Sequence, residues 1–454
     1  MQLTCEMQRI FCVSLRSAPM IALTAFATAC GDLTHVSTPD VLQPSSLDSP
    51  DGARARESYA IGIFATALAE QAQATGTLTD EFTDISGQFN GVDQRRVPST
   101  AYVFGYPYPD LTQARISALR AAQSLRRFVP DSPAEAGLMY RLAALVEIYF
   151  AENMCSGVPL TSLASDGTPM LGATVSRSQL IQRALAHLDS ASVFTPTGDT
   201  GVDIIAVSRA RALADSGDLA SASHAIAGIT AVFNVSPPYD GVNQINALYQ
   251  DIVQDLQLSV ADHEGSNGLP FRSTNDPRLP LANLGIGADG LDSVYAPSLL
   301  TSGATPVVEA TSIEVELVRA EAMLNHIGAP TTHAWLDTLN ALRTSGSYSV
   351  TSGGDTVYAA GSGGVNGLAP LADPGADSAR IDLLFRERAF WLFGSGHRQG
   401  DLRRLVRYYG RREQDVFPVG LYEHAGTSYG TDVTFVPFGE TNNPNFAGCF
   451  DRKA

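Results

Sequence analysis

Apolar residues recur with the period of an α-helix over most of the chain. The pattern is clearest between residues 380 and 409, where one stripe of a helix is formed by Ile381, Leu384, Phe385, Ala389, Leu392 and Phe393. Gly394-Ser395-Gly396 ends this helix, and a second helix begins near Gly400 and carries the inward residues Leu402, Leu405, Val406 and Tyr409. We therefore expect two packed helices joined by a tight glycine corner.

The same period predicts helices in most other parts of the chain. They cover residues 53–73, 111–128, 133–152, 176–194 and 334–343, with a helical hairpin at 202–233. Gly217-Asp218 provides the hairpin turn and alanines stand at close-contact positions, as in tetratricopeptide-type units. Irregular loops are predicted at 86–110 and 263–305, and a mobile Gly/Ser-rich insertion at about 345–378. The sequence thus predicts a mainly α fold, a helical-hairpin, tetratricopeptide-like scaffold with long irregular loops.

The N-terminus reads as a processing signal. Arg9 and Arg16 precede a short apolar run, small residues follow, and Cys30 comes next. This order predicts a signal peptide over residues 1–29 and, because it resembles a bacterial lipoprotein cleavage site, lipidation of Cys30. The alternative is a plain secretory signal with a soluble periplasmic product. Residues 30–50, rich in Ser, Thr, Pro and Asp, are predicted to be a tether, and 51–454 a single helical domain.

Composition narrows the classes of function. The 454 residues are 44% hydrophobic and 17% charged, which is typical of a globular protein with a large core. The net charge of −17 argues against nucleic acid as a partner, since phosphate binding needs clustered positive charge. Once the signal is removed, Cys155 and Cys449 are the cysteines left besides Cys30, and in an oxidising compartment they predict a disulfide. The alternative is two buried free thiols.

The corner sequence also carries a family resemblance. The stretch E-R-A-F-W-L-F-G-S-G-H-R-Q-G-D-L-R-R is similar to the C-terminal signature of the RagB/SusD family of nutrient-binding outer-membrane lipoproteins, through Glu387, Arg388, Trp391, Gly396, His397, Arg398, Asp401, Leu402 and Arg404. Ser395 stands where the family usually has an acidic residue. Weaker likenesses at 275–279, 319–324 and 436–445 spread the resemblance over nearly the whole mature chain.

The resemblance implies a SusD-like binding protein. It would be anchored by lipid to the outer membrane, face the cell surface, and capture an oligomeric nutrient, a glycan by default or a peptide. It would deliver that cargo to a TonB-dependent transporter of the SusC type. Two other functions stay open on the sequence alone: an exported glycan-active hydrolase, and a tetratricopeptide-type adaptor for envelope assembly.

No catalytic motif supports the hydrolase. The sequence contains no GxSxG, HExxH, CxxC or phosphate-loop pattern, so we expect no enzyme activity, cofactor or metal. Gly285 to Gly290 spells GxGxxG, but no βαβ context surrounds it. Asp80, Glu81 and Asp84 lack the spacing of a calcium loop, and we interpret them as solvated or capping carboxylates.

Candidate ligand contacts are chosen by residue type and loop position. They are Arg95, Tyr106, Tyr108, Phe271 and Tyr295. Aromatic faces on stiffened loops suit stacking on a sugar ring, although such rings can equally pin a loop to the core. At the corner we predict a structural ion pair of Glu387 with Arg398 or Arg388.

Overall fold

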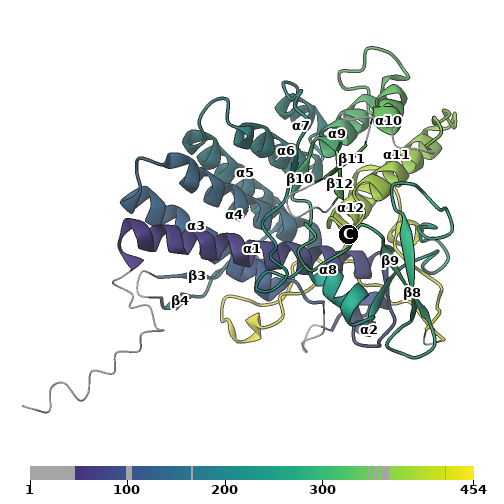
Figure 1. Cartoon of the computed structure of the whole chain (residues 1–454), viewed down its shortest axis with the longest axis horizontal. Coiled ribbons are helices and arrows are strands. Elements are labelled where there is room, and N and C mark those ends of the chain that lie inside the picture. The colour runs from purple at the N-terminus through teal and green to yellow at the C-terminus, as the bar shows by residue number, and fades with distance from the viewer. Residues whose placement is uncertain are drawn as a thin grey trace, which may run out of the picture. The chain divides into compact units, whose positions relative to one another are not determined.

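Long helices form the scaffold of the molecule, shown in Figure 1. The structure is a computed structural model that describes residues 47–98, 105–164, 167–345, 347–350, 356–359, 368–424 and 426–454. The predicted signal peptide, Cys30 and the tether up to residue 46 lie outside these ranges. Among the described residues, no helix combines the length and apolar character that crossing a bilayer requires.

The first half of the body is a set of packed antiparallel helices. They are α1 (Pro50–Leu78), α3 (Tyr108–Phe128), α4 (Pro133–Asn153) and α5 (Arg177–Phe194). Ser49 begins α1, because its hydroxyl accepts the N–H of Gly52 at 3.0 Å and Pro50 fits the first turn. Alanines such as Ala67, Ala118 and Ala143 are fully buried where these helices meet, so the backbones approach closely.

The second half repeats the hairpin theme. Its helices are α6 (Thr200–Asp215), α7 (Leu219–Ala225), α9 (Ser312–Leu324), α10 (Ala334–Ser345), α11 (Asp377–Trp391) and α12 (Arg398–Tyr408). Gly217 turns the α6–α7 hairpin with a φ of 85°, a value that favours glycine. The second arm is shorter than predicted. The helix α7 ends at Ala225, and Ile226 and Ile229 are buried in the non-helical segment that follows.

Short elements fill the connections. They are α2 (Asn90–Asp93), α8 (Ala247–Tyr249), the π-helical turn η2 (Gln250–Gln254), α13 (Glu413–Val416) and the 3₁₀ turn η3 (Glu440–Asn442). Tyr108 and Pro109 lie in the first turn of α3 rather than in an extended loop, because proline is tolerated where the helical N–H has no partner.

Strands are short and pair antiparallel in twos throughout the described ranges. The pairs are β1 (Phe82–Asp84) with β7 (Leu258–Val260), β2 (Val158–Pro159) with β5 (Thr174–Val175), β3 (Ser162–Leu163) with β4 (Pro169–Met170), β6 (Asn234–Val235) with β10 (Ala310–Thr311), β8 (Leu281–Ile286) with β9 (Ser293–Pro297), β11 (Ser347–Val350) with β12 (Thr356–Ala359), and β13 (Leu421–Tyr422) with β14 (Thr427–Ser428). The helices therefore carry the fold, and the predicted mainly α class is confirmed.

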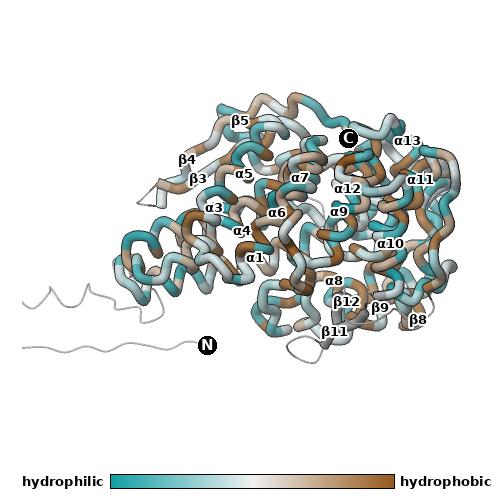
Figure 2. The backbone as a smooth tube through the Cα atoms, turned by 90° about the horizontal axis from the view of Figure 1, so that it is seen from above, coloured by the Kyte–Doolittle hydropathy of each residue, from teal (hydrophilic) through white to brown (hydrophobic). Residues whose placement is uncertain are grey.

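Hydrophobic and hydrophilic residues alternate around the helices, as the colours of Figure 2 show. One core cluster lies among α9 to α12 around the buried ring of Trp335. Leu368 and Leu371 pack against it, and Leu371 donates its N–H to Asn340 Oδ1 at 2.7 Å. The chain thus rejoins the core before residue 378, the predicted end of the insertion. Residues 346, 351–355 and 360–367 of that segment lie outside the described residues.

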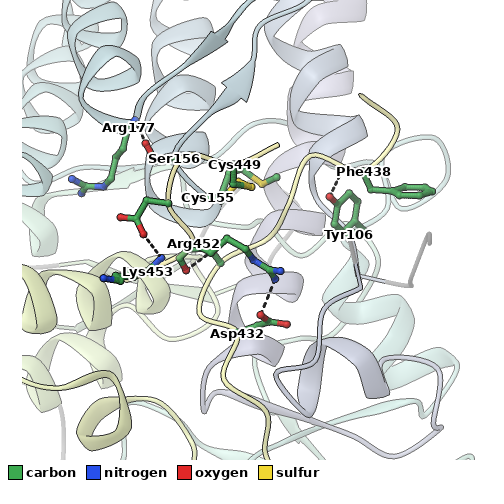
Figure 3. The surroundings of a disulfide bond; sticks show 12 residues. Tyr106, Cys155, Ser156, Arg177, Asp432, Phe438, Cys449, Arg452 and Lys453 are labelled. Carbon is green, nitrogen blue, oxygen red and sulfur yellow. Dashed lines mark hydrogen bonds and ion pairs between the residues drawn. A yellow bond between two sulfur atoms is a disulfide. The ribbon is translucent and has the colours of Figure 1, made fainter. Parts of the chain in front are cut away.

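A disulfide joins the end of α4 to the C-terminal tail. Cys155 and Cys449 are bonded with their Cα atoms 5.9 Å apart, as the sequence predicts, and Figure 3 shows their surroundings. The same contact is extended by the backbone, where Ser156 donates to the Asp451 carbonyl at 2.9 Å. The tail is therefore part of the body.

Candidate functional site

The glycine corner between α11 and α12 is held by buried ion pairs, but the predicted pairing is wrong. Arg398 binds Asp80 at the end of α1 through two contacts, Nε–Oδ1 at 2.6 Å and a second at 2.7 Å. Glu387 instead accepts from Arg278 at 2.7 Å and Arg343 at 2.8 Å.

The direction of the corner explains this exchange of partners. Gly394 and Gly396, both with positive φ, turn the chain so that Arg398 points toward α1, whereas Glu387 faces the loop before β8 and the helix α10. Arg388 does not pair with Glu387 either, because it is bonded to Asp401 by two contacts of 2.9 Å.

The remaining polar groups of the corner are also structural. Asp80, Glu81 and Asp84 are buried, so the interpretation of them as solvated groups is wrong. Each does accept a backbone N–H as a capping group would, from Leu269 at 2.9 Å, Gly394 at 3.2 Å and Ser86 at 2.9 Å. Ser395 stands where the family usually has an acidic residue. Its hydroxyl lies 2.8 Å from Nδ1 of the buried His397 and forms a hydrogen bond with it. Burial and the neighbouring Arg211 hold the pKa of His397 below its ordinary value.

The buried Glu81 gives the corner a pH dependence. Burial raises the pKa of Glu81 from 4.5 to about 8, while Arg398 opposes the shift without cancelling it. The native state then holds a proton that the unfolded chain releases between these values, so the free energy of unfolding falls as the pH rises through that window. The slope is at most about 1.4 kcal/mol per pH unit.

We therefore expect the protein to be more stable at pH 5 than at pH 8, and Glu81→Gln to flatten this difference. Burial raises the pKa of Glu70 to about 7 and that of Asp251 to about 6, so part of the slope will remain in the variant. Denaturant unfolding at both pH values measures the effect, with the exposed Glu423→Gln as control. If the free energy of unfolding changed equally with pH in the wild type and in Glu81→Gln, the raised pKa of Glu81 would be contradicted.

Four of the five predicted ligand contacts are buried. Arg95, Tyr106, Tyr108 and Phe271 are at most 4% exposed. Tyr106 accepts the N–H of Phe438, as Figure 3 shows, and Tyr108 donates to Glu440 at 3.0 Å. Arg95 donates to backbone carbonyls of the C-terminal segment, including Asp432 at 2.9 Å. These side chains hold their segments to the core and cannot reach a ligand at the surface, so their assignment as ligand contacts is corrected.

Tyr295 differs from the other four because its ring is half-buried on β9. In this strand Val294 and Ala296 point into the core, so Tyr295 lies on the opposite face, beside its cross-strand partner Asn283. The guanidinium of Arg272 lies over the ring, 4.8 Å from its centre. An aromatic face, an exposed amide and a cation thus meet on one surface.

The loop before this hairpin is fixed by Asp262. Its Oδ1 accepts the N–H groups of Arg272 at 3.1 Å and Ser273 at 3.0 Å, and also the Ser273 hydroxyl. His263 and Asn275 flank the loop with φ values of 60° and 51°, a costly backbone region for residues other than glycine. The surface of Tyr295, Asn283, Arg272 and Ser273, which we call the Tyr295 surface, is therefore held in a defined shape.

Arg272, Asn283 and Asp262 were not predicted from the sequence. The alternation Ser-Val-Tyr-Ala-Pro at 293–297 was the available signal, since it reads as a half-buried strand with Tyr295 on its outer face. Asn283 could be found only through the register of β8 with β9, which the sequence does not give.

A second polar cluster lies beneath the β13–β14 hairpin. Asp93 accepts from Tyr422 at 2.9 Å, and Glu264 from Tyr429. Burial raises the pKa of both carboxyls. Asp93 is 1% exposed, so it does not face a substrate cleft, and we interpret the cluster as a structural hydrogen-bond network. Within the described ranges, no group of three His, Cys, Asp or Glu side chains could hold a metal ion.

No protein-family model and no curated protein matches the sequence. Solved structures do match the backbone. A SusD superfamily protein from Bacteroides fragilis is 14% identical with a TM-score of 0.60, covering 86% of this chain and 96% of its own. The protein NanU of B. fragilis is 10% identical with a TM-score of 0.59, covering 90% and 99%. A SusD-like carbohydrate-binding protein from Bacteroides vulgatus is 12% identical with a TM-score of 0.52, covering 78% and 83%. At such identities the likeness is one of fold.

Proposed function

Because this chain has the SusD-like fold, as its motifs predict, we propose that it is a surface lipoprotein that captures an oligomeric nutrient. The nutrient would be a glycan by default, bound without chemical change and passed to a TonB-dependent outer-membrane transporter of the SusC type. The observation that carries the proposal is the backbone likeness over most of the chain, including one relative described as carbohydrate-binding.

The Tyr295 surface supports glycan capture. A half-exposed aromatic ring offers apolar surface to a sugar ring, and the Asn283 amide nitrogen can donate hydrogen bonds, while its Oδ1 already accepts the Gly285 N–H at 2.8 Å. The ring is contacted by the Arg272 guanidinium, and the backbone is fixed by the Ser259 hydroxyl, which accepts the Tyr295 N–H at 2.9 Å. Little side-chain freedom is then lost on binding, which favours affinity.

Tyr295→Ala removes the ring on which the sugar would stack. We expect the glycan Kd to rise by about tenfold or more, which corresponds to a loss of about 1.4 kcal/mol of binding free energy. Tyr295→Phe retains the ring and is expected to bind nearly as well as the wild type. Affinities come from calorimetric titration of glycans selected on an array. Tyr59→Ala, at a ring 54% exposed on α1, is the matched control. Full affinity in Tyr295→Ala would remove this surface from the site.

The membrane anchor and the transporter are tested in cells. Labelled fatty acid should be incorporated into the full chain and lost in Cys30→Ser, which should leave the membrane fraction. The wild-type lipoprotein should also co-purify with a large outer-membrane transporter. Incorporation that survives Cys30→Ser, or purification with periplasmic proteins alone, would contradict the proposal.

A further inference from the structure

An apolar pocket lies between the base of the β8–β9 hairpin, residues 305–313 and the end of α11. Its volume is about 150 Å³. Most of its wall is aliphatic, aromatic or proline surface, including Ile252, Pro297, Leu299, Leu300, Val308 and Ile313. Leu299, Leu300 and Val308 are half-buried, so the wall continues to the surface.

Three polar side chains in the wall form hydrogen bonds within the protein. Asn246 donates to the Thr305 carbonyl and accepts the Leu248 N–H, each at 2.9 Å. The Thr305 hydroxyl accepts two backbone N–H groups, both at 3.1 Å. Arg278 is committed to Asp276 and Glu387, with contacts of 2.7 Å to each. These three side chains already form hydrogen bonds within the protein.

This lining selects the chemistry of an occupant. A sugar hydroxyl inside the pocket would lose its water without a protein partner, at a cost of about 1–3 kcal/mol for each group. An apolar group gains about 25 cal/mol for each Å² removed from water. An engineered, enclosed cavity of about 150 Å³ lined by Leu, Ile and Phe binds benzene.

We propose that this pocket binds an uncharged aryl or branched alkyl group of about six carbon atoms. It is a separate subsite from the Tyr295 surface. Pro297 lines the pocket and stands two residues from Tyr295 on the same face of β9, so the two subsites adjoin along one strand. The inference rests on the pocket itself and stands whether or not the cargo is a glycan.

Benzene is the probe. The full-length protein should show a rise in Tm of about 1–2 °C near saturation. Methyl NMR signals of Ile252 and Ile313, which line the pocket, should shift in the same titration, while those of Ile204, which does not, should stay in place. Phenol should cause smaller changes, since its hydroxyl would lose water on entering a mostly aliphatic and aromatic wall. Unmoved Ile252 and Ile313 signals in the folded wild type would overturn the proposal.

A filling variant locates the site. Val308→Phe extends a half-buried wall residue into the pocket and should abolish the benzene response, whereas Val242→Phe, at a position 76% exposed outside it, should leave the response intact. Phenyl and methyl glycosides of one sugar then separate two sources of the group. Tighter binding of the phenyl form assigns the pocket to a substituent of the glycan, and equal binding assigns it to a free apolar molecule. A benzene response that persists in folded Val308→Phe would contradict the location.

Discussion

Replacing Arg398 with alanine is expected to lower the free energy of unfolding by about 3–5 kcal/mol. The guanidinium and the Asp80 carboxylate meet through two short contacts, and both side chains are at most 6% exposed. Removing the cation leaves the Asp80 carboxylate buried without its ion-pair partner, next to Glu81. Denaturant unfolding followed by circular dichroism measures the loss.

Two further variants make this result specific. Arg412→Ala removes an arginine paired with Asp415 on the surface, and its stability should match the wild type, because exposed pairs contribute little. The double variant Arg398→Ala/Asp80→Ala should recover part of the loss, because the stranded charge is gone. Wild-type stability in Arg398→Ala would show that the pair does not hold the corner to α1.

Loss of the Cys155–Cys449 disulfide is expected to cost about 2–5 kcal/mol. The two residues are 294 positions apart, so the bond constrains most of the unfolded chain. The variant Cys155→Ser/Cys449→Ser should unfold at lower denaturant than the wild type. Reductant should bring the wild type down to the level of the variant and leave the variant unchanged.

Thiol labelling provides the independent check on that bond. Denatured, unreduced protein should react at neither Cys155 nor Cys449, and at both after reduction. Two reactive thiols before reduction would mean that the bond does not form. An unchanged free energy of unfolding after complete reduction would mean that the backbone contacts around Ser156 already hold the tail.

The helices could be predicted because their signal is local. Stripes such as Leu384, Phe385 and Ala389 have the period of the element they build, and caps such as Ser176 lie next to it in the sequence. The corner ion pairs were mispredicted because their partners are remote. Asp80 lies 318 residues before Arg398, and no local pattern links them. The motif indicated which side chains are special without indicating what they bind.

The candidate site was only partly predictable for a related reason. Residue type and loop position describe Tyr106 and Tyr295 equally well, yet one ring is buried against the C-terminal segment and the other lies half-exposed on a hairpin. The direction of a side chain depends on the secondary structure beneath it. For Tyr295 the buried neighbours Val294 and Ala296 set that direction, whereas the C-terminal residues around Tyr106 come from a segment more than 300 residues later.

The most direct test of a capture protein is to recover its ligand after binding. The purified full-length chain would be incubated with array-selected glycans, and bound and free material would be analysed by mass spectrometry. We predict that the glycan is retained by the wild type, released far more readily by Tyr295→Ala, and recovered with its mass unchanged. Shortened glycan that accumulates with time, and no longer forms when a single carboxylate is replaced, would identify a hydrolase and contradict this account.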